Sequence, residues 1–217
     1  MVAAFAPATV SNVACGFDVL GFALDEPGDI VMAAPAEAPG VSIVEIVGDD
    51  GRLPLDARRN TAGAAVEALL AHLQTTRGVE LRIHKGLPLE SGIGSSGASA
   101  VAAVVAANEL LGRPAATDIL LACAMAGEQV GCGAVHPDNV APALLGGFVL
   151  ARQIDPPDMV RLPVPDGLAC ASPFHTESVT SLKPEALTLL MAIAARSMRK
   201  LKALCSATVR ALCCSRD

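Results

Sequence analysis

Aromatic side chains are scarce in this chain of 217 residues: they make up 2% of it, and tryptophan and tyrosine are missing. Proteins that bind single-stranded nucleic acid stack its bases on aromatic rings. The net charge of −6 would also repel a phosphate backbone. The composition therefore predicts no nucleic-acid partner.

Long apolar runs and a signal sequence are lacking as well. The longest runs, residues 98–107 and 186–195, are far shorter than the roughly 20 residues of a membrane span, so we expect core helices and no membrane partner. The seven cysteines show no paired zinc spacing, and no basic region followed by an apolar core opens the chain. These absences predict a reduced, cytoplasmic protein, and a hydrophobic content of 52% allows a buried core.

Glycine is absent after Gly167, so all 19 glycines lie at or before that position. Residues 196–217 also carry six basic side chains against one acidic one, whereas the whole chain is acidic. This shift predicts a boundary between the tail and the rest of the chain. A basic amphipathic helix in the tail would present either a solvated face or a surface for a membrane or a partner.

What the chain does contain is a glycine-rich stretch at residues 85–99, KGLPLESGIGSSGAS. An alternating, strand-like segment (79–84) precedes it, and an alanine-rich, helix-like segment (95–111) continues it. Free N–H groups at a helix N-terminus attract phosphate oxygens. Ser95 and Ser96 are candidates to cap this helix, or to reach a phosphate or a hydrated Mg²⁺. A glycine-rich turn before a core helix is the plainer alternative.

Two better-known nucleotide motifs do not fit this stretch. Gly92, Gly94 and Gly97 satisfy G-x-G-x-x-G, but a dinucleotide site needs a second parallel strand ending in an acidic residue about 20 positions later. Here the segment leads into another helical pattern instead. A Walker A loop ends in Gly-Lys-Ser/Thr, and no lysine follows these glycines.

Periodicity and turn residues place the other elements. We expect helices over 62–73, with Asn60 as the N-cap, and over 117–130, with Thr117 or Asp118 as the N-cap. Strands are expected within residues 2–12, 29–47, 148–152 and 160–164.

Three polar residues stand out in this pattern. Glu128 falls near a helix C-terminus, where a carboxylate opposes the helix dipole, so either solvent exposure or a nearby cation would offset it. Asn12 and Asp18 lie in an otherwise apolar opening. Turn formation and helix capping are their structural alternatives to a functional role.

Three segments resemble one family, in the same order along the chain. Residues 88–99, PLESGIGSSGAS, resemble the GHMP kinase signature P-x-x-x-G-L-G-S-S-A-A-S. Residues 6–21, APATVSNVACGFDVLG, and residues 136–148, HPDNVAPALLGGF, resemble two segments of homoserine kinases. Three ordered matches are more specific than any one motif. Residues 3–165 therefore resemble the GHMP kinase superfamily and, within it, the homoserine kinase family.

The resemblance implies ATP- and Mg²⁺-dependent phosphorylation of L-homoserine to O-phospho-L-homoserine, a step of threonine biosynthesis. It implies an α+β fold in which an N-terminal, ATP-binding domain (residues 1–155), like domain 2 of ribosomal protein S5, precedes an incomplete or divergent ferredoxin-like domain (residues 156–217). Dimerisation is usual among such relatives, so a homodimer is an expectation too. A non-catalytic nucleotide-binding remnant and another small-alcohol GHMP kinase are the alternatives.

The resemblance also implies a nucleotide site. Asn60 and Lys85 would lie near the adenine, and Ser96 and Glu128 would hold Mg²⁺. The residues around the phosphates would be Pro88, Leu89, Glu90, Ser91, Gly92, Ile93, Gly94, Ser95, Ser96, Gly97 and Ala98.

On the acceptor side, the resemblance places Asn12, Asp18, His136 and Asn139 around homoserine, with Asp18 beside the ammonium group. Asn139, Glu128 and Ser96 would form the catalytic set. Mevalonate kinase has a catalytic aspartate where Asn139 aligns, and an amide cannot act as a general base. The implied mechanism is in-line attack with the hydroxyl proton passing to phosphate or water, and Asp138 is the alternative base.

The chain departs from the family pattern in three places. Glu90 replaces a small residue and puts a carboxylate near the phosphates. Gly97 replaces an alanine, which costs the first helical turn about 1 kcal/mol. The family's third motif is glycine-rich and follows this region, so a glycine-free tail cannot contain it; we expect truncation or a reading-frame change after about Ala171.

Overall fold

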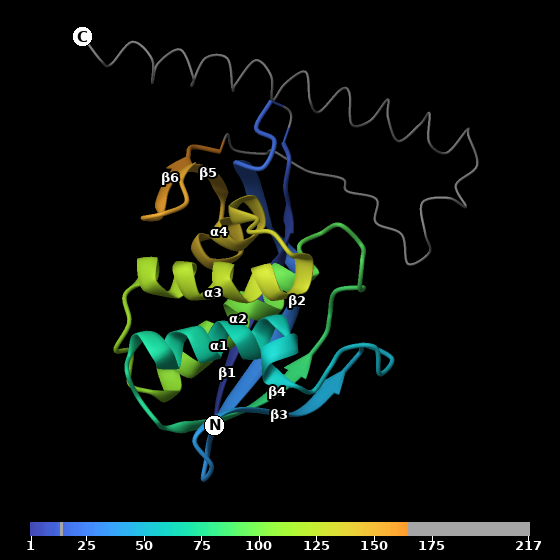
Figure 1. Cartoon of the computed structure of the whole chain (residues 1–217). Helices are drawn as coiled ribbons and strands as arrows, with labels where there is room; N and C mark the ends of the chain where they lie inside the picture. Colours follow the sequence, from blue (N-terminus) through green and yellow to red (C-terminus); the bar gives the residue numbers. More distant parts are fainter. Residues whose placement is uncertain (14, 165–217) are drawn as a thin grey trace.

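The computed structural model describes residues 1–13 and 15–164, which form a mixed α+β domain (Figure 1). The strands are β1 (Val2–Val10), β2 (Leu20–Ala36), β3 (Gly40–Val47), β4 (Gly78–His84), β5 (Phe148–Gln153) and β6 (Asp158–Leu162). The helices are α1 (Thr61–His72), α2 (Ser95–Leu110), α3 (Thr117–Cys132) and α4 (Pro137–Leu145), with a 3-10 turn at Ala57–Arg59.

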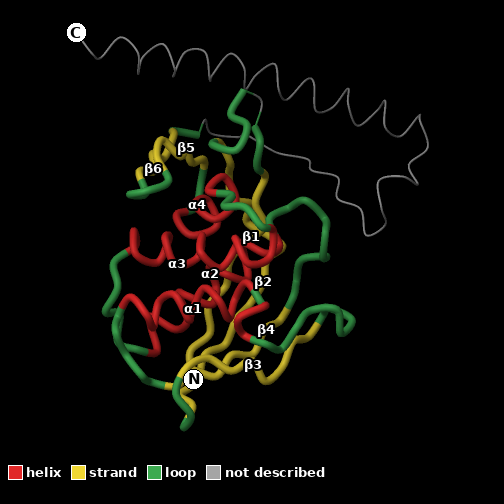
Figure 2. The backbone as a smooth tube through the Cα atoms, in the orientation of Figure 1, coloured by secondary structure: helices red, strands yellow, loops and turns green. Residues whose placement is uncertain are grey.

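One long strand, β2, organises the sheet. It pairs antiparallel with β1 along most of its length, with β5 through residues 20–22 and with β4 through residues 30–36. β3 lies parallel to β4, and β6 completes a hairpin with β5. Figure 2 shows these strands running beside the helical layer. Since β2 touches three strands, it connects the two halves of the sheet.

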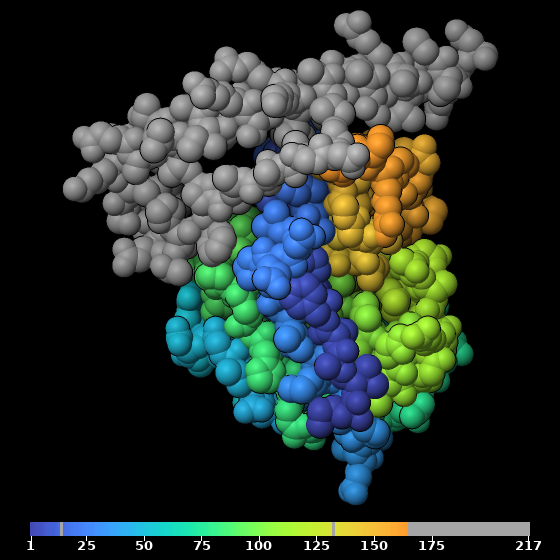
Figure 3. Space-filling model, turned by 180° about the vertical axis from the view of Figure 1, so that it is seen from behind, coloured from blue at the N-terminus to red at the C-terminus, as the bar shows by residue number. Residues whose placement is uncertain are grey.

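The helices cover one face of the sheet, and the core lies between the two layers. Alternate residues point inward, such as Val31 and Ala33 on β2 and Leu81 and Ile83 on β4, as expected for a sheet with one buried face. α2 is buried on nearly all sides, which its small alanine side chains permit. Figure 3, from the opposite side, shows β1 and β2 (blue) at the surface.

Some local predictions from sequence are confirmed and others are wrong. Asn60 caps α1, because its side chain accepts from Ala62 N at 3.0 Å. The expected capping of α2 by Ser95 or Ser96 is wrong, since the N-cap is Gly94 in the left-handed conformation (φ 71°).

Two element boundaries also differ from expectation. Neither Thr117 nor Asp118 caps α3; the N-cap is Ala116, and it makes no side-chain capping bond. β2 starts at Leu20 rather than near residue 29, so a segment with the turn-like sequence Asp25-Glu26-Pro27-Gly28 belongs to the strand. β1 pairs with β2 on both sides of this segment, through residues 22–23 and 28–33, and residues 24–27 form an irregularity in the register between them.

The expected ferredoxin-like domain and the basic tail fall mainly on residues 165–217, outside the described residues. The hairpin of β5 and β6 spans the predicted boundary between residues 155 and 156, and that boundary stays a prediction. Within residues 1–13 and 15–164, no helix has the length and apolar character needed to cross a membrane.

Candidate nucleotide and acceptor site

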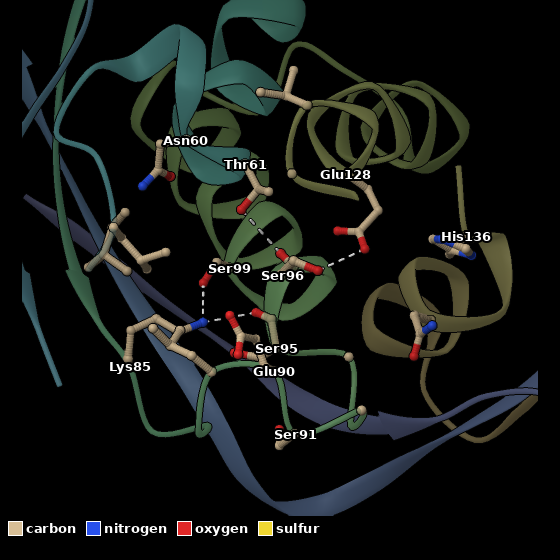
Figure 4. Close-up of a pocket in the computed structure, with 18 of the residues that line it drawn as sticks. Asn60, Thr61, Lys85, Glu90, Ser91, Ser95, Ser96, Ser99, Glu128 and His136 are labelled. Atoms are coloured by element: carbon tan, nitrogen blue, oxygen red, sulfur yellow. Dashed lines mark hydrogen bonds between the residues drawn. The ribbon is translucent and has the colours of Figure 1, made fainter. Parts of the chain in front are cut away.

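A cavity of about 720 Å³ lies at the N-terminal end of α2. Its walls come from the loop before α1, the end of β4, the glycine-rich loop, the end of α3 and the start of α4. Figure 4 shows Ser95 and Ser96 between Lys85 on one side and Glu128 and His136 on the other. Segments that are far apart in sequence therefore meet around the helix start.

The glycine-rich loop turns sharply into α2. Gly94 has φ 71°, and a Cβ there would lie 2.1 Å from Thr9 Oγ1, so only glycine fits. The first bond of the helix runs from Ala98 N to Gly94 O, which leaves the N–H groups of residues 95–97 without an acceptor inside the helix. Thr9 N also donates to Ile93 O at 3.0 Å and ties the loop to β1. Such a helix start suits an anion.

Ser96 and Glu128 meet beside these amides. Ser96 Oγ donates to Glu128 Oε1 at 2.8 Å, and Glu128 is buried, so the solvent-exposed alternative for this residue is wrong. α3 can approach because Gly131 packs on α1, where a Cβ would lie 2.4 Å from Thr61 Cγ2. The sequence analysis did not predict this close packing of α3 against α1.

The donor set suits Mg²⁺ shared with a phosphate. In the part of the chain that the structure describes, no group of three or more His, Cys, Asp or Glu side chains could hold a metal alone. Mg²⁺, however, binds through one or two protein oxygens together with substrate phosphates, and it retains waters. The hydroxyl of Ser96 and the carboxylate of Glu128 are such oxygens, next to the first-turn amides of α2.

Lys85 lines the cavity, but its ammonium group is buried and fully engaged. It donates to Asp29, to Ser95 O at 2.9 Å and to Ser99 Oγ at 2.8 Å. Burial lowers the pKa of Lys85, while the carboxylate of Asp29 opposes that shift. On the same wall, Asn60 donates through its side chain to Pro54 O at 3.1 Å in addition to capping α1.

On the opposite wall, the side chain of Asn139 has a fixed orientation. Thr9 Oγ1 donates to Asn139 Oδ1 at 2.9 Å. The side-chain NH₂ group of Asn139 is therefore the part that faces the cavity. Thr9 is fully buried, which makes this contact rigid. His136 lines the cavity one turn earlier and opens α4, with its carbonyl accepting from Asn139 N.

Asn12 and Asp18 are exposed and lie between β1 and β2, in a segment that we call the acceptor loop (residues 11–13 and 15–19 of the described chain), in which Val13 is buried. Asn12 N donates to Asp138 Oδ2 at 3.1 Å, and Asp18 N donates to Asn12 Oδ1 at 3.0 Å. Asn12 (φ 55°) and Asp18 (φ 59°) both adopt left-handed backbone conformations. Burial raises the pKa of Asp138, whose Oδ1 has no hydrogen-bond partner among the described residues.

Residues 60–147 match the family of GHMP kinases N terminal domain. This chain carries a GHMP kinase N-terminal domain. The match includes α1, the glycine-rich loop, α3 and α4, which together form most of the cavity.

Individual relatives agree with this GHMP kinase domain. The chain is 50% identical over 191 residues to "Homoserine kinase" of Chlorobium phaeovibrioides, a match that covers 83% of this chain and 60% of that protein. It is 54% identical over 147 residues to "Homoserine kinase" of Xanthomonas campestris pv. campestris, covering 68% and 46% respectively. The chain thus spans about 60% or less of the length of these curated relatives.

Solved structures show the same fold. A homoserine kinase from Cytophaga hutchinsonii superposes with a TM-score of 0.72 and 54% identity, covering 76% of this chain and 52% of that one. A mevalonate kinase superposes with a TM-score of 0.57 at 13% identity, which shows the fold alone.

The GHMP kinase domain brings most of the predicted site residues to one cavity and leaves five outside its lining. The predicted residues that line it are Asn12, Asn60, Lys85, Leu89, Glu90, Ser91, Gly92, Gly94, Ser95, Ser96, Glu128, His136 and Asn139. Those outside its lining are Asp18, Pro88, Ile93, Gly97 and Ala98.

Sequence reasoning missed five residues of this region. Arg52 and Arg59 line the cavity from a polar loop that carried no motif. Thr9, Asp29 and Ser99 lie beneath the loop, buried. A lone acid on the inward side of an apolar strand was a usable signal for Asp29, because a buried carboxylate needs partners.

Proposed function

We propose that this GHMP kinase domain transfers the γ-phosphoryl group of ATP to the hydroxyl of L-homoserine. The observation that carries the proposal is the meeting of the α2 amides with the Ser96–Glu128 pair in one cavity. Homoserine kinase relatives at about half identity support the choice of acceptor. Phosphoryl transfer depends mainly on alignment and charge neutralisation, which such a site can supply.

On the nucleotide side, the N–H groups of residues 95–97 would bind phosphate oxygens, and the glycine-rich loop would surround the triphosphate. Ser96 and Glu128 would hold Mg²⁺, which supplies charge neutralisation on the phosphates when it is bound. Asn60 and Lys85 would flank the nucleotide on the wall near the adenine. With its three donor protons used inside the protein, Lys85 would act through its position rather than through a direct bond to phosphate.

On the acceptor side, Asn12, His136 and Asn139 would orient homoserine, and Asp18 would meet its ammonium group when the acceptor loop folds inward. Asn139 offers an N–H donor to the acceptor oxygen and cannot take its proton. The hydroxyl proton would pass to phosphate or water. Asp138 is a poorer candidate base, because it lies buried behind the acceptor loop with Oδ2 bonded to Asn12 N.

The test combines calorimetry with a coupled ADP-release assay on the 217-residue chain. We expect Mg·ATP to bind, ADP release to require L-homoserine, and mevalonate to neither replace it nor compete with it. Glu128→Gln should raise the Mg²⁺ concentration needed for half-maximal ADP release at least tenfold, since it removes one anionic metal ligand. Absence of any heat with Mg·ATP would refute the proposal.

A second candidate is nucleotide binding without turnover. The position of Asp18 outside the cavity lining favours it, because the acceptor half is less complete than the nucleotide half. Mg·ATP binding with no ADP release under any acceptor would support this candidate. A homodimer and a cytoplasmic location stay predictions, the first of them testable by light-scattering chromatography.

A further inference from the structure

A fully buried carboxylate, Asp29, lies directly beneath the glycine-rich loop. Its Oδ1 accepts from Gly86 N at 3.0 Å and from Leu87 N at 3.1 Å, the two amides where the chain enters the loop. Its Oδ2 accepts from Ser99 Oγ at 2.6 Å and from the ammonium group of Lys85. One side chain from β2 therefore contacts both the entrance of the loop and the helix that follows it.

Lys85 extends the same network to the first turn of α2. Ile30 on β2 pairs with His84, the last residue of β4. One step further along these antiparallel strands, Asp29 faces Lys85, and their side chains meet. From there Lys85 Nζ donates to Ser95 O, the first helical residue after the loop, and to Ser99 Oγ one turn later. Figure 4 shows both of these bonds reaching from Lys85 toward α2. Asp29 and Lys85 together fix both ends of the loop.

Stability alone is a weak reason for such a pair. Removing two charges from water is expensive, and apolar side chains of similar size often stabilise a core as well or better. The side chains of Asp29 and Lys85 are 0% and 2% exposed, so they bear the full cost of desolvation. Hydrogen bonds to charged groups do, however, define direction and distance tightly. The position of the α2 amides is what this network determines.

We propose that Asp29 is a positioning residue for the glycine-rich loop, which we call the phosphate loop from here on for its proposed role: acting through Lys85 and Ser99, it holds the amides of residues 95–97 in the geometry that binds the triphosphate. The inference rests on the proposed function of the loop in nucleotide binding. Asp29 touches neither nucleotide nor acceptor. Its role is to set the separation between residues 86–87 and the start of α2.

The central test is Asp29→Asn in the 217-residue chain. Asparagine keeps an acceptor for Gly86 N and Leu87 N, but its NH₂ group replaces the oxygen that accepts from Lys85 and Ser99. We expect at least a tenfold weaker affinity for Mg·ATP by calorimetry, and about threefold for Ser99→Ala, which removes one bond of the network.

A matched control separates positioning from general loss of stability. Asn108 is also buried and bonds Ala115 in both directions, far from the cavity lining. Asn108→Ala should lower the unfolding temperature to a comparable degree and leave Mg·ATP affinity within twofold. If Asp29→Asn lowered the unfolding temperature but left the affinity unchanged, the proposal would be overturned.

A double variant and hydrogen exchange keep the inference testable in every case. Asp29→Asn combined with Lys85→Met removes the unpaired buried charge, so we expect thermal stability to recover while affinity stays low; joint recovery would contradict positioning. Without nucleotide, the amides of residues 92–97 should exchange faster in Asp29→Asn and not in Asn108→Ala. Unchanged exchange in Asp29→Asn would refute the positioning role, whether or not the wild-type chain binds Mg·ATP. A wild-type chain that binds no Mg·ATP would refute the proposed function instead.

Discussion

The phosphate loop and the acceptor loop lie at the same cavity but are held in different ways. The phosphate loop is anchored from below by a fully buried carboxylate that accepts four hydrogen bonds. The acceptor loop is mostly exposed: besides its turn bonds and the buried Val13, it is held by Asn12 N donating to Asp138 Oδ2 and by Asp18 N donating to Asn12 Oδ1. Few buried contacts mean a low cost of local opening.

The two halves of the site are therefore organised differently. The geometry that we propose binds phosphate is built into the packed layer between sheet and helices, so it exists without a ligand. The geometry proposed for the acceptor includes Asn12 and Asp18, which both have left-handed backbone conformations in a loop at the surface. We infer that the nucleotide half is preorganised, whereas the acceptor half gains its final form on binding.

The largest expected effect comes from Gly94→Ala, with Gly92→Ala as its matched control. Both glycines have φ near 70°, but a Cβ at Gly94 would overlap buried Thr9, whereas a Cβ at Gly92 meets nothing within 4 Å. Backbone strain and overpacking together cost about 3 kcal/mol at Gly94, or roughly a hundredfold in Mg·ATP affinity. Strain alone at Gly92 costs about 1 kcal/mol, or roughly fivefold. Calorimetry on both variants checks this, and equal losses would show that the phosphate loop is not tightly packed.

A second expected contrast concerns thiol reactivity. Cys15 is exposed in the acceptor loop, whereas Cys123 is buried in α3, where burial raises its pKa to about 11. Only the thiolate reacts, so Cys123 should be labelled by iodoacetamide at pH 8 about a hundredfold more slowly than Cys15. Peptide mass spectrometry resolves the two sites. Slow labelling of Cys15 without ligand would mean that the acceptor loop is already closed.

The phosphate loop was predictable from sequence, because its signal is local. The glycine pattern at residues 92–97, followed by a proline-free alanine-rich segment, indicated a loop and a helix start, and the structure has both there. Asn60 was likewise predictable as a cap, since capping needs only a short side chain next to a helix. These features depend on neighbours within a few positions.

What sequence could not give depends on long-range register and backbone angles. The contact of Asp29 with Lys85 joins positions 56 apart and follows from how β2 aligns with β4. The capping error at Ser95 arose because the helix begins from a left-handed Gly94, whose φ no composition reveals. For Asp18, the resemblance named the residue but not whether its loop lies over the cavity.

A smaller effect is expected at Asp138, which supports the acceptor loop. Burial raises its pKa above the ordinary 3.8, so in the interval just above that value the folded chain holds a proton that the unfolded chain has lost. Its contribution to stability therefore falls as pH rises through that interval. Asp138→Asn keeps an acceptor for Asn12 N and removes the buried charge, so the free energy of unfolding at pH 7 should rise by about 1 kcal/mol.

Urea unfolding at several pH values measures this effect. The variant should lose the part of the pH dependence that lies above pH 3.8, whereas Asp25→Asn, at an exposed position of β2, should keep it. A loss of stability at neutral pH in Asp138→Asn would indicate that the ionised carboxylate is the stabilising form. That result would also give the acceptor loop a firmer anchor than the comparison assumes.

The smallest expected effect lies at the rim of the phosphate loop. Glu90 and Arg52 both line the cavity and form an ion pair at 2.9 Å, with side chains 82% and 51% exposed. Exposed pairs contribute little to stability, so Glu90→Gln should leave the unfolding temperature unchanged. It also frees Arg52 and removes a negative charge near the phosphates. Mg·ATP affinity should therefore rise about threefold at low salt, and screening should abolish most of the gain in concentrated salt.

Glu45→Gln is the control for this rim effect, because the substitution changes the net charge by the same amount. Glu45 pairs with Arg82 on the sheet, outside the cavity lining. Calorimetric titrations at low and high salt should separate the two variants only at low salt. Equal gains would assign the effect to net charge rather than to position. A gain specific to Glu90→Gln would mean that the carboxylate of Glu90 at the rim weakens phosphate binding. Affinity for Mg·ATP would then depend on the buried hydrogen bonds of Asp29 beneath the loop rather than on charge at the surface.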